Sequence, residues 1–516
     1  MQLPARIFDL HTHLFNARYL PLASVIAHAM GRDHSPLARQ VARLLQALTG
    51  SAYAAVPVEA AFAAPAGAAS EAWEQACLEH IWRVTQHELL LSTGSLRAVE
   101  QGMAVQMTQS MDAPVFDRLR ASEWMEILLG LEQIDYAAEG APQAAPALGL
   151  LAPVPDETIY PGLEIAGTFP DFLDWAGRVV KKALRTVVRL MDPSAWGEAV
   201  NYPAFFLALL HSEEQLLQKF WSGYGPGLPP LQCAHYLLDM QPAFRGQEAP
   251  YYPLRPVQED RMQNLQRAHP ALVFGFSAFD PRREDWRERA LEALAKGFVG
   301  FKFYPAMGYK PAGNAPLIQA RIDAFFDFCV ARDLPVFAHC TPLGFQTRFK
   351  LGAYAHPRYW QEVLQQPRWH GLRLCLGHAG GGSMVNGPLH SAGWMARSEA
   401  QWQEPDNFAR IVCELCTTYP SVFCEVGYLM ALLEDEGLGV FEANLQRARH
   451  AARQGARPYE LLDKMAYGSD WHMPDVIART RQYLERFLGL FDRPEYAGHR
   501  EQFFWRNAYR FLRLPL

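Results

Sequence analysis

The chain has 516 residues, of which 50% are hydrophobic, and its formal net charge is −6 at pH 7. This length exceeds one ordinary domain, although barrel domains often run long, and the hydrophobic content is sufficient for a large core. The small acidic excess argues against a nucleic-acid-binding protein, which normally shows a basic patch or stripe, and the lack of any run of 18 apolar residues argues against a membrane span.

The first predicted element is a strand over residues 8–13, with the sequence FDLHTH. Residues i and i+2 of a β-strand point to the same face, so His11 and His13 project together from one short strand. Two neighbouring imidazoles form half of a transition-metal site. The pair therefore predicts metal binding, provided that later segments supply the remaining ligands.

More than 200 residues then separate this strand from the next convincing one. We expect residues 16–229 to form a mostly helical insertion. One helix is predicted over Arg178–Met191, where apolar residues recur at helical spacing and basic residues occupy the other face.

Strands and helices alternate regularly after the insertion. Further strands are predicted at Leu231–Met240, Ala271–Phe279, Gly297–Pro305, Leu334–His339, Leu372–His378, Val422–Val426 and Met465–Asp470. Helices are predicted at Arg283–Lys296, Ala320–Arg332, Trp360–Gln366 and Phe408–Tyr419. Such alternation implies a parallel sheet, and the first strand brings the count to eight. We therefore predict an α/β fold, a (β/α)8 TIM barrel made by residues 1–15 and 230–516. The insertion at 16–229 follows strand 1 on the side that carries active sites, so we expect it to be a lid.

Four of the later strands carry a polar residue at or near the end. Lys302 lies within the fourth strand, and the fifth, sixth and eighth strands end in His339, His378 and Asp470. A parallel barrel brings such strand ends together on one face, where its active site lies. Four histidines and an aspartate placed in this way predict a metal site. Alternation also puts Lys302 on the same face as Tyr304, toward the barrel interior.

The order His-x-His, Lys, His, His, Asp resembles that of the amidohydrolase superfamily, whose members are metal-dependent enzymes on a distorted (β/α)8 barrel. The runs Gly377–Gly381, Gly468–Trp471 and Asn507–Leu512 resemble the branch called amidohydrolase family 2, which mixes hydrolases with non-oxidative decarboxylases. The resemblance covers residues 5–15 and 230–516. It implies that the chain is a metal-dependent enzyme, and zinc is the ion that we expect.

The resemblance implies a two-metal site if Lys302 is carboxylated. In superfamily members with a lysine in this strand, the lysine reacts with CO2 and the carbamate bridges two ions. His11 and His13 would then hold the first ion, and His339 and His378 the second. An ammonium is costly in the barrel interior and a neutral lysine cannot supply two oxygen donors, so we favour the carboxylated form.

The alternative is a one-metal site in which Lys302 stays unmodified and binds a substrate carboxylate. The ligands would then be His11, His13, His339 and Asp470, and His378 would position the substrate.

The two sites predict different reactions. With two ions, a metal-activated hydroxide attacks the carbonyl of an amide, lactam or lactone, while Asp470 ligates one ion and acts as general base. With one ion, the alternative reaction is non-oxidative decarboxylation of an aromatic or unsaturated carboxylate. We expect the hydrolase, with His472 and Tyr304 as substrate-binding residues, because His472 follows Asp470 by two positions and Tyr304 shares the face of Lys302.

A barrel that has become a binding or scaffold module is the other class of function, and it need hold no metal. The expected partner is a small-molecule substrate rather than nucleic acid, and a homo-oligomer is compatible with the sequence. The first strand leaves no room for a signal peptide, and the eight cysteines show no paired framework. We therefore expect a cytoplasmic protein with reduced thiols.

Overall fold

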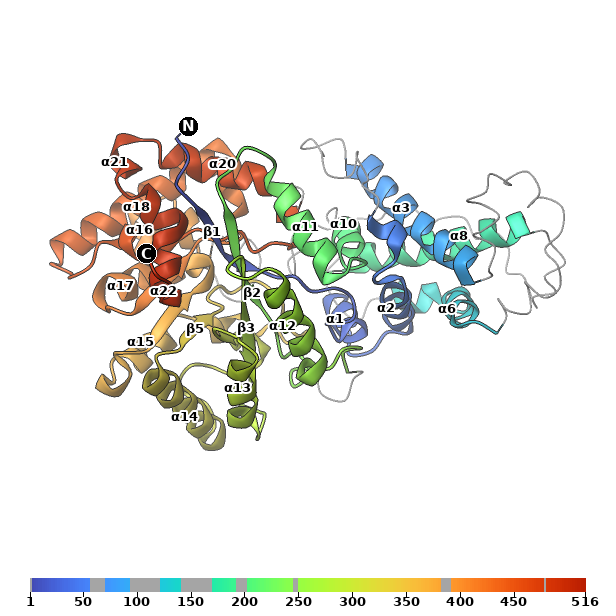
Figure 1. Cartoon of the computed structure of the whole chain (residues 1–516), viewed down its shortest axis with the longest axis horizontal. Coiled ribbons are helices and arrows are strands. Elements are labelled where there is room, and N and C mark those ends of the chain that lie inside the picture. Colours follow the sequence, from blue (N-terminus) through green and yellow to red (C-terminus); the bar gives the residue numbers. More distant parts are fainter. Residues whose placement is uncertain are drawn as a thin grey trace.

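The structure is a computed structural model, shown in Figure 1. It describes residues 2–55, 70–92, 121–140, 169–191, 202–244, 249–381, 391–477 and 479–516. The expected insertion at 16–229 therefore lies partly outside the described residues.

Eight parallel strands form the centre of the molecule. They are β1 (Ile7–Thr12), β2 (Leu231–Tyr236), β3 (Val273–Phe279), β4 (Gly300–Phe303), β5 (Pro335–Ala338), β6 (Arg373–Leu376), β7 (Val422–Glu425) and β8 (Met465–Ala466). They are hydrogen-bonded in sequence order from β1 to β8. The backbone N–H of Leu10 donates to Tyr467 O at 3.0 Å, and that of Asp470 donates to His11 O at 2.8 Å, which closes the seam between the first and last strands. The predicted (β/α)8 barrel is confirmed.

Helices surround the barrel, as Figure 1 shows. They are α12 (Glu259–Ala268), α13 (Trp286–Ala295), α14 (Pro316–Arg332), α15 (Arg358–Leu364), α16 (Glu399–Trp402), α17 (Phe408–Thr418), α18 (Asp435–Gln454), α19 (Pro474–Ile477), α20 (Thr480–Leu490), α21 (Pro494–Ala497) and α22 (Asn507–Leu512). The helices α13, α14, α15 and α17 correspond to the four predicted ones.

Several strands are shorter than predicted. β2 ends at Tyr236 rather than Met240, and β8 comprises only Met465–Ala466 instead of extending to Asp470. Asp470 has a φ of 63°, in the left-handed region, which a strand cannot contain. The last predicted ligand therefore lies on a turn beyond the strand.

A register shift in β1 turns both histidines toward the barrel interior. Phe8 and Leu10 pack inside the barrel in the same cluster as Tyr236 and Phe337, so strict alternation would point His11 outward. The pairing of β1 with β2 is irregular between Asp9 and Thr12, however, and the His11 ring lies 4.7 Å from that of Phe337. A bulge of this kind re-aims side chains next to active sites.

The described part of the chain between β1 and β2 consists mainly of helices joined by loops. The helices are α1 (Leu22–Ala29), α2 (Pro36–Leu48), α3 (Ser70–Ser92), α6 (Glu123–Glu132), α7 (Tyr136–Gly140), α8 (Phe169–Leu190), α10 (Tyr202–Ala208) and α11 (Glu213–Tyr224). They extend to one side of the barrel in Figure 1. α8 contains most of the predicted helix Arg178–Met191, and one of its basic residues, Lys181, pairs with Glu79 of α3 at 2.6 Å.

Two of these helices contact the barrel near the ends of its first and last strands. The ring of Phe205 in α10 stacks 5.7 Å from that of His472, which follows β8. The hydroxyl of Tyr224 in α11 donates to Asp9 of β1 at 2.5 Å. Within the described residues, no helix is both long enough and apolar enough to cross a membrane.

Candidate metal centre

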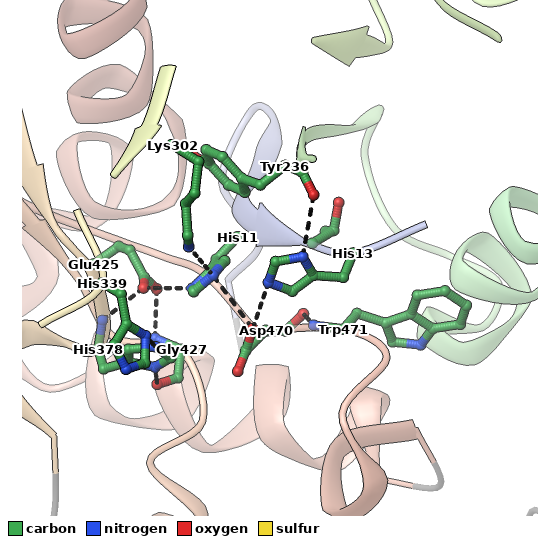
Figure 2. A network of polar contacts seen from close by, with 12 residues as sticks. His11, His13, Tyr236, Lys302, His339, His378, Glu425, Gly427, Asp470 and Trp471 are labelled. Carbon is green, nitrogen blue, oxygen red and sulfur yellow. Dashed lines mark hydrogen bonds and ion pairs between the residues drawn. The ribbon is translucent and has the colours of Figure 1, made fainter. Parts of the chain in front are cut away.

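Four histidines converge at the C-terminal ends of β1, β5 and β6 (Figure 2), and a hydrogen bond fixes one ring nitrogen of each. His11 Nδ1–H donates to Glu425 Oε1 at 2.7 Å, and His13 Nδ1–H donates to Tyr236 O at 3.3 Å. His378 Nδ1–H donates to Gly427 O at 3.0 Å, and His339 Nε2–H donates to Leu343 O at 2.7 Å. A proton fixed on one ring nitrogen leaves the lone pair on the other. The four nitrogens left for ligation are His11 Nε2, His13 Nε2, His339 Nδ1 and His378 Nε2.

The first pair of nitrogens faces the aspartate beyond β8. Asp470 Oδ1 lies 3.3 Å from both His11 Nε2 and His13 Nε2. One ligand atom from each of these three residues lies within 4.8 Å of the others. Three side chains at this separation can surround one ion, and nitrogen with carboxylate oxygen suits zinc and other divalent transition metals.

The second pair lies beside the first. His339 Nδ1 is 3.1 Å from His378 Nε2, and the His378 ring lies 4.9 Å from that of His11. His378 sits on a turn after β6 rather than at the strand end, and both it and Ala379 have left-handed backbones, with φ of 59° and 46°. Such conformations are uncommon outside glycine and cluster at functional sites.

Lys302 projects from β4 toward both pairs. Its Nζ lies 3.0 Å from His11 Nε2 and 4.3 Å from the centre of the Phe337 ring. The side chain is 1% exposed. Burial lowers the pKa of Lys302 to about 8, although Asp470 and Glu425 act in the opposite direction.

The electrostatics of the centre favour neutral imidazoles. Burial and the nearby Lys302 ammonium hold the pKa of His11 and of His13 well below the usual value. Burial also lowers the pKa of His378 to about 4 and raises that of Asp470 to about 6. Neutral imidazoles are the form that binds metals.

The structure thus brings together the six residues that the sequence suggested as metal ligands. Their exposure ranges from 1% to 6%. They are His11, His13, Lys302, His339, His378 and Asp470. The donor set suits one or two divalent ions, and the convergence of ring nitrogens and a carboxylate in one place is the feature that makes it suitable.

His472 lies outside this convergence. Its Nδ1–H donates to His13 O at 2.6 Å, and its ring packs against Phe15 and Phe205. Its Nε2 is buried and has no hydrogen-bond partner among the described residues. The His472 ring thus packs among aromatic side chains rather than among the side chains of the six residues.

Tyr304 lies against the second pair of histidines. Its ring stacks on that of His339 at 4.2 Å, and its hydroxyl accepts a hydrogen bond from the backbone N–H of Phe345. Gly344 is tightly packed here, because a Cβ at this position would lie 2.7 Å from His339 Cε1 and from the Tyr304 hydroxyl. Tyr304 and Lys302 also line a small cavity at the ends of β2 to β4, whose other walls include Met240 and Phe279.

Two buried acids were not among the residues singled out from the sequence. Glu425 ends β7 and bonds to His11; burial raises its pKa, and the backbone N–H groups of His378 and Gly427 act in the opposite direction. Asp9 precedes the histidine pair in β1 and accepts four hydrogen bonds. The available signal for Glu425 was an acidic residue inside the apolar run Val422–Val426.

Comparison with known proteins identifies the family. The model of the family Amidohydro_2, described as "Amidohydrolase", matches residues 252–514. The match spans half of the chain, so the protein belongs to this amidohydrolase family and is an enzyme of the amidohydrolase superfamily. No curated protein sequence matches the chain.

Several solved structures show a distant likeness. A probable 2-pyrone-4,6-dicarboxylic acid hydrolase from Acinetobacter baumannii, with citric acid bound, is 15% identical, with 58% of this chain and 89% of that chain covered and a TM-score of 0.36. An amidohydrolase from Burkholderia multivorans with bound zinc is 16% identical, with 55% and 84% covered and a TM-score of 0.36. A 5-carboxyvanillate decarboxylase from Novosphingobium aromaticivorans, complexed with manganese and 4-hydroxy-3-methoxy-5-nitrobenzoic acid, is 12% identical, with 58% and 83% covered and a TM-score of 0.37. At these scores the likeness carries no argument about the reaction.

Proposed function

We propose that this enzyme is a metal-dependent hydrolase of an amide, lactam or lactone. The observation that carries the proposal is the position of Lys302, whose amine lies 3.0 Å from His11 Nε2, inside a group of four histidines whose ring nitrogens converge. An ammonium at this place would repel metal ions, whereas burial favours the neutral amine, which is the form that reacts with CO2. The carbamate so formed is anionic and offers two oxygen donors.

The residues would hold two ions as follows. His11 and His13 would bind the first ion through Nε2, and His339 and His378 would bind the second through Nδ1 and Nε2. Carboxylated Lys302 would bridge them. Divalent ions held there, of which zinc suits the ligands best, would supply an activated water and polarise the substrate carbonyl.

Asp470 would ligate the first ion and move the proton. Its Oδ1 lies 3.3 Å from the two nitrogens of that site, on the face of the barrel where substrate arrives. It would accept a proton from the attacking water and return it to the leaving nitrogen or oxygen.

Tyr304 and His472 would bind the substrate. Because the Tyr304 hydroxyl accepts from Phe345 N–H, its own proton is free to be donated to a substrate oxygen. The buried His472 Nε2 would accept a hydrogen bond from a substrate N–H or O–H. Phe205 of α10 stacks on His472, which supports a role for residues 16–229 as a lid on the substrate pocket.

The test is to change Lys302 and count metals. Lys302→Ala should lose the second ion and most of the hydrolysis of cyclic amides and lactones, and Lys302→Glu should recover part of both by restoring a carboxylate. Lys464→Ala is the matched control, because Lys464 is also buried with a lowered pKa but precedes β8 at the opposite end of the barrel. Elemental analysis of protein purified without chelators provides the metal content.

Two results would count against the proposal. Less than a tenth of an equivalent of metal in the wild type, with no gain of activity on adding zinc, would remove the metal-dependent reaction altogether. Full metal content and full activity in Lys302→Ala would rule out the two-ion hydrolase mechanism. The one-metal decarboxylase of aromatic or unsaturated carboxylates would then be the better description.

A further inference from the structure

Glu425 is enclosed by groups that belong to both halves of the candidate metal centre (Figure 2). Its Oε1 accepts from His11 Nδ1–H at 2.7 Å and from the backbone N–H of His378, also at 2.7 Å. Its Oε2 accepts from the backbone N–H of Gly427. The side chain is fully buried. One carboxylate therefore contacts a histidine of the first pair directly and the backbone of a histidine of the second pair.

Two glycines, Gly427 and Gly468, pack closely against this carboxylate. A Cβ on Gly468 would lie 2.3 Å from Glu425 Oε2, and one on Gly427 would lie 2.8 Å from it. Oε1 is occupied by two donors, and its 2.7 Å distance to His11 Nδ1 is that of a charge-assisted hydrogen bond. Although Glu425, His11 and His378 offer ligand atoms within 4.8 Å of one another, these contacts indicate a hydrogen-bond acceptor rather than a ligand.

The two hydrogen bonds to Oε1 have different consequences. The bond to His11 keeps the proton on Nδ1, leaves the lone pair on Nε2 and makes that nitrogen a better donor. The bond to the backbone of His378 secures a turn in which two successive residues, His378 and Ala379, adopt left-handed conformations. This turn directs His378 Nε2 toward His339 Nδ1, 3.1 Å away.

We propose that Glu425 is a positioning residue that holds both halves of the metal centre in place through His11 and the His378 turn. This inference rests on the proposed function, because it takes His11 and His378 to be ligands of two different ions. It goes beyond that function because it names a residue that binds neither ion as the one that fixes the distance between the two ion sites.

The experiment replaces Glu425 by Gln in the full chain. The amide offers a single, uncharged acceptor oxygen. In the place of Oε1 it accepts more weakly from both His11 and the backbone of His378 and leaves the N–H of Gly427 without an acceptor, and in the place of Oε2 it loses both bonds to Oε1. Metal-free protein is titrated with Zn2+ in competition with a chromophoric chelator, and with Co2+ while its visible absorption is recorded. We expect both equivalents of Zn2+ to bind about 10–100-fold more weakly than to the wild type and the Co2+ spectrum to change.

Glu259→Gln is the matched control. Glu259 is a buried glutamate of α12 that pairs with Lys296 at 3.1 Å and with Ser277 at 3.2 Å, outside the barrel interior. It should lose thermal stability without a change in either Zn2+ affinity. If Glu425→Gln behaves in the same way, with affinities and spectrum like those of the wild type, Glu425 is merely structural and the inference is overturned. Weakening of only one equivalent would also overturn it.

A second variant covers the case in which Glu425→Gln does not fold. Glu425→Asp keeps the charge but withdraws the carboxylate by one methylene, so we expect weaker binding at both equivalents, and unchanged affinities would again overturn the inference. The wild-type titration separates this inference from the proposed function. If the wild type does not bind two ions, the proposed hydrolase fails and the inference fails with it. If it does, only the ratio between variant and wild type bears on Glu425.

Discussion

Asp9 offers a sharp test of what holds the first and last strands together beneath the metal centre. Its Oδ1 accepts from the backbone N–H groups of His11 at 3.1 Å and Ser469 at 2.9 Å. Its Oδ2 accepts from the hydroxyls of Ser469 and Tyr224, both at 2.5 Å. Asp9→Ala would leave two buried amides without an acceptor. At about 1–3 kcal/mol for each unsatisfied group, the expected loss is about 2–6 kcal/mol.

Asp9→Asn should cost much less. The amide oxygen can replace Oδ1 and satisfy both backbone donors, while the two hydroxyls rotate to accept from the amide NH2; Tyr224 also has Tyr467 as a partner at 3.0 Å. Exchanging charge-assisted for neutral hydrogen bonds predicts a loss of about 1–2 kcal/mol.

Urea unfolding of the metal-free protein, followed by circular dichroism, measures both losses as the change in midpoint multiplied by the m value. Equal losses of unfolding free energy for the two variants would refute the reasoning, because the two unsatisfied backbone N–H groups would then not be the main cause of the loss in Asp9→Ala. So would a loss below about 0.5 kcal/mol for Asp9→Ala.

Two further outcomes are expected. Gly344→Ala should lower kcat/KM and the affinity for the second ion, because the new Cβ would displace His339. Gly313→Ala is the control: Gly313 also has a positive φ, but only Lys310 Nζ lies near its Cβ position, at 3.6 Å, so neither quantity should change. Equal effects of the two variants in a zinc titration and a kinetic assay would contradict this prediction. Burial lowers the pKa of His211 to about 3, so the folded state binds fewer protons than the unfolded state and stability falls as pH drops below about 6.5. His211→Gln removes this loss, so its unfolding free energy relative to the wild type should rise by about 2 kcal/mol between pH 6.5 and 5, and parallel pH profiles would contradict the assignment.

The barrel could be predicted because its strands are short apolar runs that end in polar residues. The helix α18 was missed although Leu438, Phe441, Leu445 and Ala448 are buried at helical spacing, so the signal was present. The predicted strands extended beyond the observed strand ends for a different reason. Whether a chain leaves the sheet at Tyr467 or at Asp470 depends on a left-handed backbone that residue types do not reveal.

The candidate site shows the same limit. Residue type and strand position were enough to single out six side chains, and period-2 alternation correctly turned Lys302 inward. Alternation gives no direction for His472, because Asp470 breaks the strand pattern two residues earlier. A role for Glu425 could not be predicted from the sequence alone. An acidic residue within a strand can face either the barrel interior or the surrounding helices, and only the contact with His11 shows which of the two applies.

The seam between β1 and β8 has a consequence for biosynthesis. Asp9 and Ser469 are hydrogen-bonded across 460 residues of sequence, and the histidine pair and Asp470 flank them. At a translation rate of roughly 5–20 residues per second, the ribosome produces Asp470 about 20–90 s after the histidine pair. During that interval the nascent chain presents His11 and His13 without their partners. The six candidate ligands are therefore all present only when synthesis is essentially complete, so the candidate metal site cannot assemble earlier.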